Sequence, residues 1–376
     1  MNPEIDLAWM DRALALAEGG RYGVSPNPMV GAVVVRGRRK VAEAFHRRAG
    51  TPHAEALALA RAGRATRGAD LYVTLEPCAH HGRTPPCAEG IVAAGIRRVI
   101  VASRDPNPLV RGRGLARLTR AGIEVLWADA SRRSRAERQN ERFRLWISQR
   151  RPFVLAKWAA TLDGRIASSS GESRWITGPA ARRRALLLRE EYDAVLVGAG
   201  TILADDPLLT RRLSRNPGRH WRVVLDGRLR ISERARVLRQ PNGCVIATAV
   251  RPTHPRARRL AHRGAEIWSL PGSRPGQVDL KRLLAELAGR DVTGLMVEGG
   301  GETLAAFFAE RLVDAVAAFV APRLLGGRAS PGAVGGRGFR LQDMAELDAM
   351  EIELVGRDLF ITGRVRRTRA RRAAGR

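Results

Sequence analysis

The stretch from residue 53 to residue 87 contains His53-Ala54-Glu55, Glu76-Pro77-Cys78 and Thr84-Pro85-Pro86-Cys87. One histidine and two cysteines form a ligand set that holds a catalytic Zn²⁺ and leaves its fourth position for water. Glu55 follows the histidine by two residues, close enough to move protons without being a ligand. We therefore predict that His53, Cys78 and Cys87 bind zinc and that Glu55 is the catalytic acid and base.

This prediction rests on the occurrence of all these residues together, because a single histidine or cysteine in an apolar setting is more often part of the core. The chain has three cysteines, and two of them belong to this set. His53 and Cys87 each open an apolar helical pattern, and a helix N-terminus favours the thiolate. The H-x-E and P-C pattern is typical of zinc nucleobase deaminases, although eight residues here separate Cys78 from Cys87.

The large positive net charge suggests a nucleic-acid partner, but the distribution of the basic residues along the chain argues against one. Lys and Arg total 66 against 37 acidic residues, for a net charge of +29, and only three of the 66 are lysine. The arginines are spread along the chain, which indicates a compositional bias rather than a binding patch. Aromatic residues make up 5%, so stacking platforms for single strands are not evident. We expect no nucleic-acid partner.

The remaining composition indicates a cytoplasmic protein without a membrane partner. The chain contains no apolar segment of 18 residues, and its start lacks the pattern of a secretory signal. Two cysteines are assigned to the metal and Cys244 is left alone, so no disulfide framework is expected.

Apolar β-rich runs alternate with helical patterns, which predicts α/β domains. A chain of 376 residues is long enough for two of them. We expect domains at 1–149 and 150–363 and a basic, disordered tail at 364–376. In the first half we predict strands at 29–35, 71–75, 98–101 and 123–127, and helices at 5–17, 53–62, 87–94 and 131–149. In the second half we predict strands at 153–157, 194–197, 221–225, 244–248, 295–297 and 315–320.

A glycine turn stands out in the second half. Val297-Glu298 runs into Gly299-Gly300-Gly301 and then into a helical pattern. Bare backbone N–H groups at a helix N-terminus suit a phosphate, although a glycine turn alone is more often structural. No G-x-G-x-x-G occurs at a strand-to-helix turn, so a standard dinucleotide-binding domain is not predicted.

Longer motifs then identify a family. They are Pro26-Asn27-Pro28-Met29-Val30-Gly31, His80-His81-Gly82-Arg83, Asp105-Pro106-Asn107-Pro108, Thr161-Leu162-Asp163-Gly164-Arg165 and Leu203-Ala204-Asp205-Asp206-Pro207. From about residue 6 to residue 363 the chain resembles the bifunctional riboflavin-biosynthesis deaminase/reductase of bacteria. The resemblance implies an α/β fold with an N-terminal cytidine-deaminase-like zinc domain and a C-terminal dihydrofolate-reductase-like domain that uses NADPH.

The resemblance also implies the chemistry. The first domain deaminates 2,5-diamino-6-(5-phosphoribosylamino)-4(3H)-pyrimidinone, and the second reduces its ribosyl group to ribityl with hydride from NADPH. Implied cofactor contacts are Ala159, Trp175, Thr201, Asp205, Gly227 and the turn from Gly300 to Ala306, with Gly300, Gly301, Glu302 and Thr303 foremost. Implied substrate contacts are Asn27, Lys157, Ser173, Arg189, Leu209, Arg212 and Glu298, and His80, His81 and Arg83 are placed to meet the substrate phosphate.

Several alternatives stay open at this point. Asn27 also fits an Asx-turn between two prolines, and in so arginine-rich a chain Arg189 and Arg212 are equally plausible as surface residues. Lys157 stands out because lysine is rare here. For the whole protein, the competing hypotheses are a nucleic-acid base deaminase and a zinc-stabilised scaffold, and the intact Glu55 argues against the scaffold. A homo-oligomer is left open.

Overall fold

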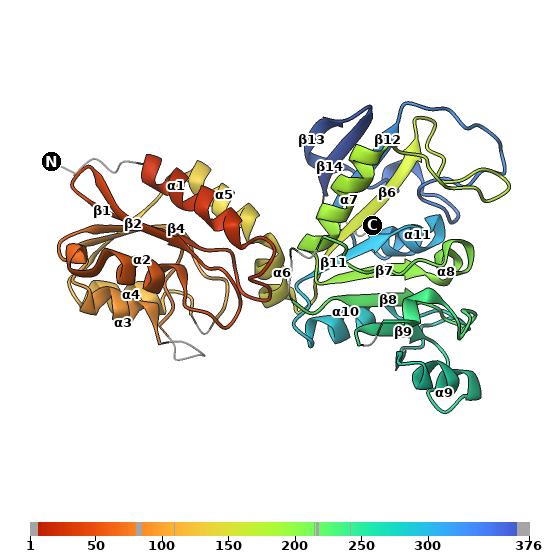
Figure 1. Ribbon diagram of the computed structural model, residues 1–376, viewed down its shortest axis with the longest axis horizontal. Coiled ribbons are helices and arrows are strands. Elements are labelled where there is room, and N and C mark those ends of the chain that lie inside the picture. The colour runs from red at the N-terminus through yellow and green to blue at the C-terminus, as the bar shows by residue number, and fades with distance from the viewer. Residues whose placement is uncertain are drawn as a thin grey trace, which may run out of the picture. The chain divides into compact units, whose positions relative to one another are not determined.

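The computed structural model describes residues 7–79, 85–108, 110–213, 215, 218–240 and 242–366. The chain forms two compact units, one made of Met1–Arg151 and Arg215–Gly218 and the other of Pro152–Ser214 and Arg219–Arg376 (Figure 1). Among the described residues, no helix is long and apolar enough to cross a membrane.

The first unit is built on a five-stranded sheet in the order β2-β1-β3-β4-β5. Its strands are β1 (Gly31–Arg36), β2 (Arg39–Phe45), β3 (Asp70–Leu75), β4 (Arg98–Ser103) and β5 (Glu124–Trp127). β1 is antiparallel to β2 and β3, whereas β3, β4 and β5 are parallel. The carboxyl ends of β3 and β4 therefore lie at one edge of the sheet, where active sites of open α/β sheets form.

Helices cover both faces of this sheet (Figure 1). They are α1 (Ala8–Ala17), α2 (Ala54–Ala62), α3 (Cys87–Ala93), α4 (Arg113–Arg120), α5 (Ala130–Gln139) and α6 (Glu141–Gln149). α2, α3 and α4 pack against one face through a core that includes Ala58, Ile91 and Leu118. α1 and α5 pack against the other through Met10, Leu14 and their neighbours.

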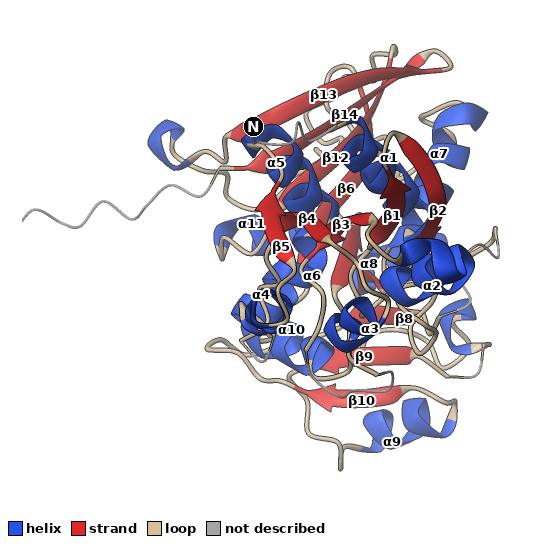
Figure 2. Ribbon diagram, turned by 90° about the vertical axis from the view of Figure 1, so that its left-hand side faces the viewer, coloured by secondary structure: helices blue, strands red, loops and turns tan. Residues whose placement is uncertain are grey.

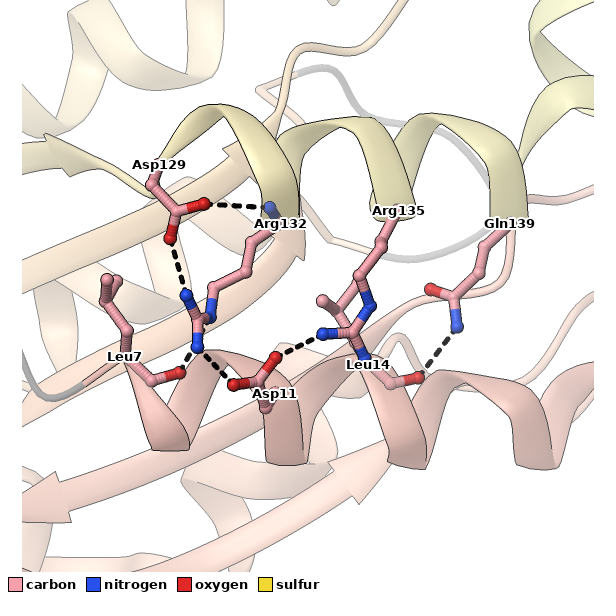
Figure 3. Close-up of polar contacts among 7 residues, drawn as sticks. All are labelled: Leu7, Asp11, Leu14, Asp129, Arg132, Arg135 and Gln139. Carbon is pink, nitrogen blue, oxygen red and sulfur yellow. Dashed lines mark hydrogen bonds and ion pairs between the residues drawn. The ribbon is translucent and has the colours of Figure 1, made fainter. Parts of the chain in front are cut away.

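Polar contacts fix α1 to α5 along their length (Figure 3). Arg132 donates to the Leu7 carbonyl at 3.1 Å and to Asp129 at 2.7 Å, and it also contacts Asp11. Gln139 donates to the Leu14 carbonyl at 2.9 Å, about two helical turns further along. Because these contacts satisfy backbone groups as well as charges, they set the register between two helices that are 125 residues apart in the chain.

The second unit contains a nine-stranded sheet in the order β10-β9-β8-β7-β11-β6-β12-β14-β13 (Figure 2). Its strands are β6 (Phe153–Thr161), β7 (Ala194–Gly198), β8 (Trp221–Leu225), β9 (Cys244–Thr248), β10 (Glu266–Ser269), β11 (Gly294–Glu298), β12 (Ala315–Ala321), β13 (Leu347–Val355) and β14 (Asp358–Val365). The seven strands from β10 to β12 are parallel to their neighbours, and β14 and β13 are antiparallel.

The helices of this unit are α7 (Pro179–Glu191), α8 (Ala199–Asp205), α9 (Pro255–His262), α10 (Leu280–Ala288) and α11 (Gly301–Ala309). One core cluster joins the central parallel strands to α10 and α11, with Phe307 and Leu283 fully buried in it. α8 follows β7 directly and α11 begins three residues after β11 ends. Both helix starts therefore lie at the carboxyl edge of the parallel strands.

Every strand that the sequence predicts is present, with both ends within two residues of the expected ones in all but β6, which ends four residues later. Sequence reasoning missed β2, β10, β13 and β14. The helix expected at 131–149 is divided into α5 and α6 at Asn140, whose side chain bonds the Met29 backbone on both sides at 2.7 and 2.9 Å. The expected start of the tail differs from the structure, because β14 continues past Gly363 and pairs Arg364 with Ala315. Residues 367–376 lie outside the described residues.

Candidate active sites

The three predicted zinc ligands lie together in the first unit. His53 precedes α2 in an extended conformation, Cys78 follows β3, and Cys87 is the first residue of α3. His53 Nδ1 lies 3.2 Å from Cys87 Sγ and 3.7 Å from Cys78 Sγ, and all three ligand atoms lie within 4.8 Å of one another. Tetrahedral zinc, with bonds of about 2.0–2.3 Å, requires ligand atoms about 3.5–4 Å apart. The donor set and its spacing fit zinc.

Burial and the neighbouring ligand residues determine the ionisation of the side chains in this site. Glu55, the second residue of α2, is 4% exposed, and burial raises the pKa of its carboxyl. A hydrogen bond with Cys87 and the nearby His53 together lower the pKa of the Cys78 thiol to about 4, although burial opposes them. A carboxyl with a raised pKa beside a thiolate-bearing ligand set suits proton transfer near neutral pH.

Sequence reasoning missed His46, which is 2% exposed beside the metal ligands. Its ring meets the His53 ring edge-on, with centroids 5.3 Å apart. Burial lowers the pKa of His46, so the neutral ring donates from Nδ1 to the Pro52 carbonyl at 3.2 Å and accepts at Nε2 from Asn27 Nδ2 at 3.1 Å. His46 thus holds the side chain of Asn27 beside the site. It escaped notice because it directly follows β2, a strand that the sequence did not reveal.

The second unit contains a cavity of about 340 Å³. Eight of the residues that resemblance assigned to cofactor or substrate line it. They are Lys157, Ala159, Ser173, Trp175, Thr201, Asp205, Glu298 and Gly300. These residues come from β6, α8, β11 and two connecting segments that are far apart in the sequence.

A buried charge network lies at one wall of this cavity. The guanidinium of Arg189 donates to both carboxylate oxygens of Glu298, at 3.0 and 2.7 Å, and to the Thr210 carbonyl at 3.1 Å. Lys157 Nζ lies 3.9 Å from the same carboxylate. Burial alone raises the pKa of Glu298, but Arg189 and Lys157 together lower it to about 2. Glu298 is therefore ionised and held in a fixed orientation.

Seven other expected contacts are not among the residues that line the cavity: Gly227, Gly301, Glu302, Thr303, Arg189, Leu209 and Arg212. Gly227 approaches the Gly276 carbonyl so closely that a Cβ would lie 1.8 Å from it. Glu302 accepts from the Gly336 N–H at 3.0 Å, and the Thr303 hydroxyl lies against Gly198. Their assignment to the cofactor stays a prediction.

The segment around Leu209 and Arg212 is held by the buried Glu190 and the half-buried His220. The Arg212 N–H donates to Glu190 at 3.1 Å. The Leu209 carbonyl accepts from His220 Nε2 at 3.1 Å, and Leu209 itself has a φ of 57°, a conformation that is costly for a branched side chain. Burial and nearby arginines lower the pKa of His220 to about 3. No pattern in the sequence indicated a role for His220. His80, His81 and Arg83 lie outside the described residues.

Comparison with known proteins covers both units. The family description "Cytidine and deoxycytidylate deaminase zinc-binding region" matches residues 3–103, and "RibD C-terminal domain" matches residues 152–361. The chain is 40% identical to "Riboflavin biosynthesis protein RibD" of Bacillus amyloliquefaciens, over 94% of this chain and 95% of the relative. It is 41% identical to the Escherichia coli protein of the same name, over 78% of this chain and 82% of the relative.

The chain belongs to the RibD family. Two solved structures agree with this. "Acinetobacter baumannii RibD, form 1" has a TM-score of 0.86 at 36% identity and covers 96% of this chain and 99% of its own. A Thermotoga maritima protein described as a diaminohydroxyphosphoribosylaminopyrimidine deaminase/5-amino-6-(5-phosphoribosylamino)uracil reductase has a TM-score of 0.83 at 34% identity, and covers 96% and 98%. The predicted fold class, a cytidine-deaminase-like domain followed by a dihydrofolate-reductase-like domain, is confirmed.

Proposed function

We propose that this chain is the bifunctional deaminase/reductase of riboflavin biosynthesis, a zinc-dependent aminohydrolase and NADPH-dependent oxidoreductase. The observation that carries the proposal is the pairing, in one RibD-family chain, of a His-Cys-Cys zinc site beside buried Glu55 with a separate cavity containing Lys157 and Glu298. The substrate is the phosphorylated diaminopyrimidine, a small molecule. Because the family match extends through both units, it supports this substrate over the alternative of nucleic acid. We further propose that the protein acts in the cytoplasm.

In the deaminase unit, His53, Cys78 and Cys87 would hold the zinc. When bound, Zn²⁺ supplies a Lewis acid that activates water for attack on the amine-bearing ring carbon. Glu55 accepts one proton of the attacking water on its carboxylate and passes it to the ring nitrogen. It then takes the second proton from the new hydroxyl on the ring carbon, which becomes a carbonyl, and passes it to the amine that leaves as ammonia. Asn27, oriented by His46, binds the pyrimidine so that this carbon faces Glu55.

In the reductase unit, the cavity would hold NADPH and the ribosylamino group of the substrate together. When bound, NADPH supplies the hydride, and the protein supplies orientation and electrostatics. Glu298 binds the pyrimidine from a position fixed by Arg189. Lys157 places a compact ammonium near the sugar, where it stabilises negative charge on the sugar oxygen.

The test is incubation of the purified, zinc-loaded protein with the diaminopyrimidine phosphate, with and without NADPH. We expect ammonia release in both cases and loss of NADPH absorbance in the complete mixture only. The two activities should also separate: His53→Ala stops ammonia release but leaves reduction of the deaminated pyrimidine intact. No ammonia release from a correctly folded, zinc-loaded protein would refute the deaminase assignment.

A further inference from the structure

The motif Thr161-Leu162-Asp163-Gly164-Arg165 forms a tight turn at the end of β6. The Gly164 N–H donates to the Thr161 carbonyl at 2.9 Å, and the Thr161 N–H donates to the Arg165 carbonyl at 2.9 Å. Gly164 has a φ of 78°, which favours glycine over any residue with a side chain. Because Lys157 lies on β6 and lines the reductase cavity, the turn follows a strand that forms part of the cavity wall.

The side chain of Asp163 binds a segment that is distant in the sequence. We call this segment, residues 323–336, the strap; it lies in the connection from β12 to β13, beside the loop that follows β6 (Figure 1). Two successive N–H groups of the strap donate to the two oxygens of Asp163, that of Leu325 at 3.1 Å and that of Gly326 at 2.7 Å. The Thr161 hydroxyl donates to the same carboxylate at 2.6 Å. These donors lower the pKa of Asp163 to about 2, so the carboxylate is ionised and the three bonds are charge-assisted.

Arg165 and the backbone of the turn bind the strap further along. The Arg165 guanidinium donates to the Ser330 carbonyl at 2.8 Å, and the Arg165 backbone pairs with Gly332 in a single β-bridge. The Gly164 carbonyl accepts from the Ala333 N–H at 3.1 Å. The turn therefore holds the strap along most of its length, and it does so through backbone groups of the strap.

Apolar packing contributes little to the position of the strap. Its side chains Leu324, Leu325 and Val334 are 77%, 44% and 37% exposed, and hydrophobic stabilisation is roughly proportional to the apolar area removed from water. The backbone groups of so exposed a segment can bond to water instead of protein. The acceptors and donors of the turn therefore determine where the strap lies.

The strap in turn contacts the reductase cavity at its start and in its middle. At its start, the Arg323 guanidinium donates to the carbonyl of Trp175 at 3.1 Å, and Trp175 lines the cavity. Further along, Ala333 lines the cavity itself. A shift of the strap would therefore displace two parts of the cavity wall at once.

At its end the strap packs against the glycine turn that precedes α11. The Gly335 N–H donates to the Gly301 carbonyl at 3.0 Å, and the Gly336 N–H donates to the Glu302 carboxylate at 3.0 Å. A Cβ on Gly301 would lie 2.8 Å from the Gly332 carbonyl, so the strap leaves no room for a side chain there. The strap therefore reaches the turn at which the cofactor phosphate is expected to bind.

We propose that Asp163 and Arg165 are positioning residues of the reductase, which hold the strap as the wall of the cavity that NADPH requires. This role rests on the proposed function, since it takes the cavity as the NADPH site. Neither side chain is among the described residues that line the cavity, so both act through the strap. Loss of either should weaken NADPH binding and raise the KM for NADPH, while kcat at saturating NADPH changes little.

Fluorescence titration of the zinc-loaded full chain with NADPH, in the absence of substrate, tests the proposal. Asp163→Ala removes the acceptor of two strap N–H groups, and we expect it to raise the NADPH dissociation constant about tenfold. Arg165→Met removes the bond to Ser330 and should raise it about threefold. Should Asp163→Ala not fold, Asp163→Asn keeps one acceptor oxygen and should also raise the constant about threefold.

Asp279→Ala is the matched control, and its NADPH affinity should be that of the wild type. Asp279 also accepts a backbone N–H, that of Arg282 at 3.0 Å, and it lies in the same unit at the start of α10, outside the cavity wall. Unchanged affinity in folded Asp163 and Arg165 variants, or an equal loss in Asp279→Ala, would overturn the proposal. A wild type that does not bind NADPH would refute the reductase assignment itself, and the role of the strap with it.

Hydrogen exchange of the strap amides gives a readout that is independent of catalysis. If the position of the strap strengthens NADPH binding, NADPH must by linkage stabilise that position to the same degree. In the wild type we therefore expect NADPH to slow the exchange of residues 323–336 several-fold. Without cofactor, Asp163→Asn should speed this exchange and leave the β11 amides unchanged. Strap exchange that NADPH does not alter, in a wild type that binds the cofactor, would overturn the proposal.

Discussion

The ion pair between Arg189 and Glu298 should contribute far more to the stability of the second unit than a surface pair. Both side chains are only 12% exposed, and the pKa of Glu298 falls from 4.5 to about 2 despite its burial. At about 1.4 kcal/mol per unit, the cations around Glu298 stabilise its ionised form by about 3 kcal/mol. Arg189→Met leaves a buried carboxylate without its main partner and should cost about 3–5 kcal/mol.

Native-state hydrogen exchange of the β11 amides measures this cost, because these amides open only when the second unit unfolds. The coupling comes from a double-mutant cycle of Arg189→Met and Glu298→Gln, and we expect about 2–4 kcal/mol. The matched control is Arg222→Met with Glu298→Gln. Arg222 is also buried but donates to three carbonyls, of Val237, Gln240 and Asn242, so its coupling to Glu298 should be near zero. A coupling below about 0.5 kcal/mol for Arg189 would refute the reasoning.

Four further outcomes are expected. Glu55→Gln should keep one zinc per chain but lose ammonia release, whereas Cys87→Ser should lose both the zinc and ammonia release. Near-normal deamination by Glu55→Gln would exclude the proton-transfer role of Glu55. Gly300→Val should weaken NADPH binding at least tenfold without changing deamination. Gly300 has a φ of 75°, and a Cβ added there would lie 3.3 Å from the Thr201 hydroxyl. Unchanged NADPH affinity in a folded variant would remove this turn from the cofactor site. His220 has a folded pKa of about 3, below its ordinary 6.5, so protonation of the unfolded chain costs stability as pH falls from 6.5 toward 3. The wild type should therefore lose up to about 1.4 kcal/mol per pH unit more than His220→Gln in urea unfolding, and parallel pH profiles would contradict this. Truncation after Arg366 should leave both activities unchanged, since the last residues of β14 are kept.

The sequence was most informative where one local pattern determines both structure and chemistry. The zinc ligands fall at strand ends and helix starts, and the chain folds there by short-range rules: an apolar strand, a turn, and a helix that begins at Cys87. Their approach to within 4.8 Å brings the starts of α2 and α3 beside the segment that follows β3. His46 could not be found in this way, because β2 carries the mixed sequence Arg39–Phe45 and only one of its faces is buried.

The geometry of the reductase site could not be predicted from local sequence patterns, because its residues meet through long-range contacts. Arg189 is on α7 and Glu298 ends β11, 109 residues later. Resemblance assigned Arg189 to the substrate, and the structure shows that its guanidinium also makes three hydrogen bonds within the protein. The β13–β14 hairpin escaped prediction for a related reason. Its apolar residues face outward, so the alternation that marks a strand does not point toward a core.

The excess of arginine also has a structural consequence that composition did not predict. Arg98 and Arg222 are 5% and 3% exposed, and each is tolerated inside because its planar guanidinium reaches several acceptors at once: a carboxylate for Arg98, and three carbonyls for Arg222. An ammonium cannot meet acceptors spread in this way. Of the three lysines, Lys40 and Lys281 are exposed. Lys157 instead lies at the cavity wall, 3.9 Å from the Glu298 carboxylate that Arg189 already binds bidentately. Arg189 already occupies both oxygens of the Glu298 carboxylate, so the second cation there must be small and adjustable. The Lys157 ammonium meets this requirement, and its charge stays available to the substrate.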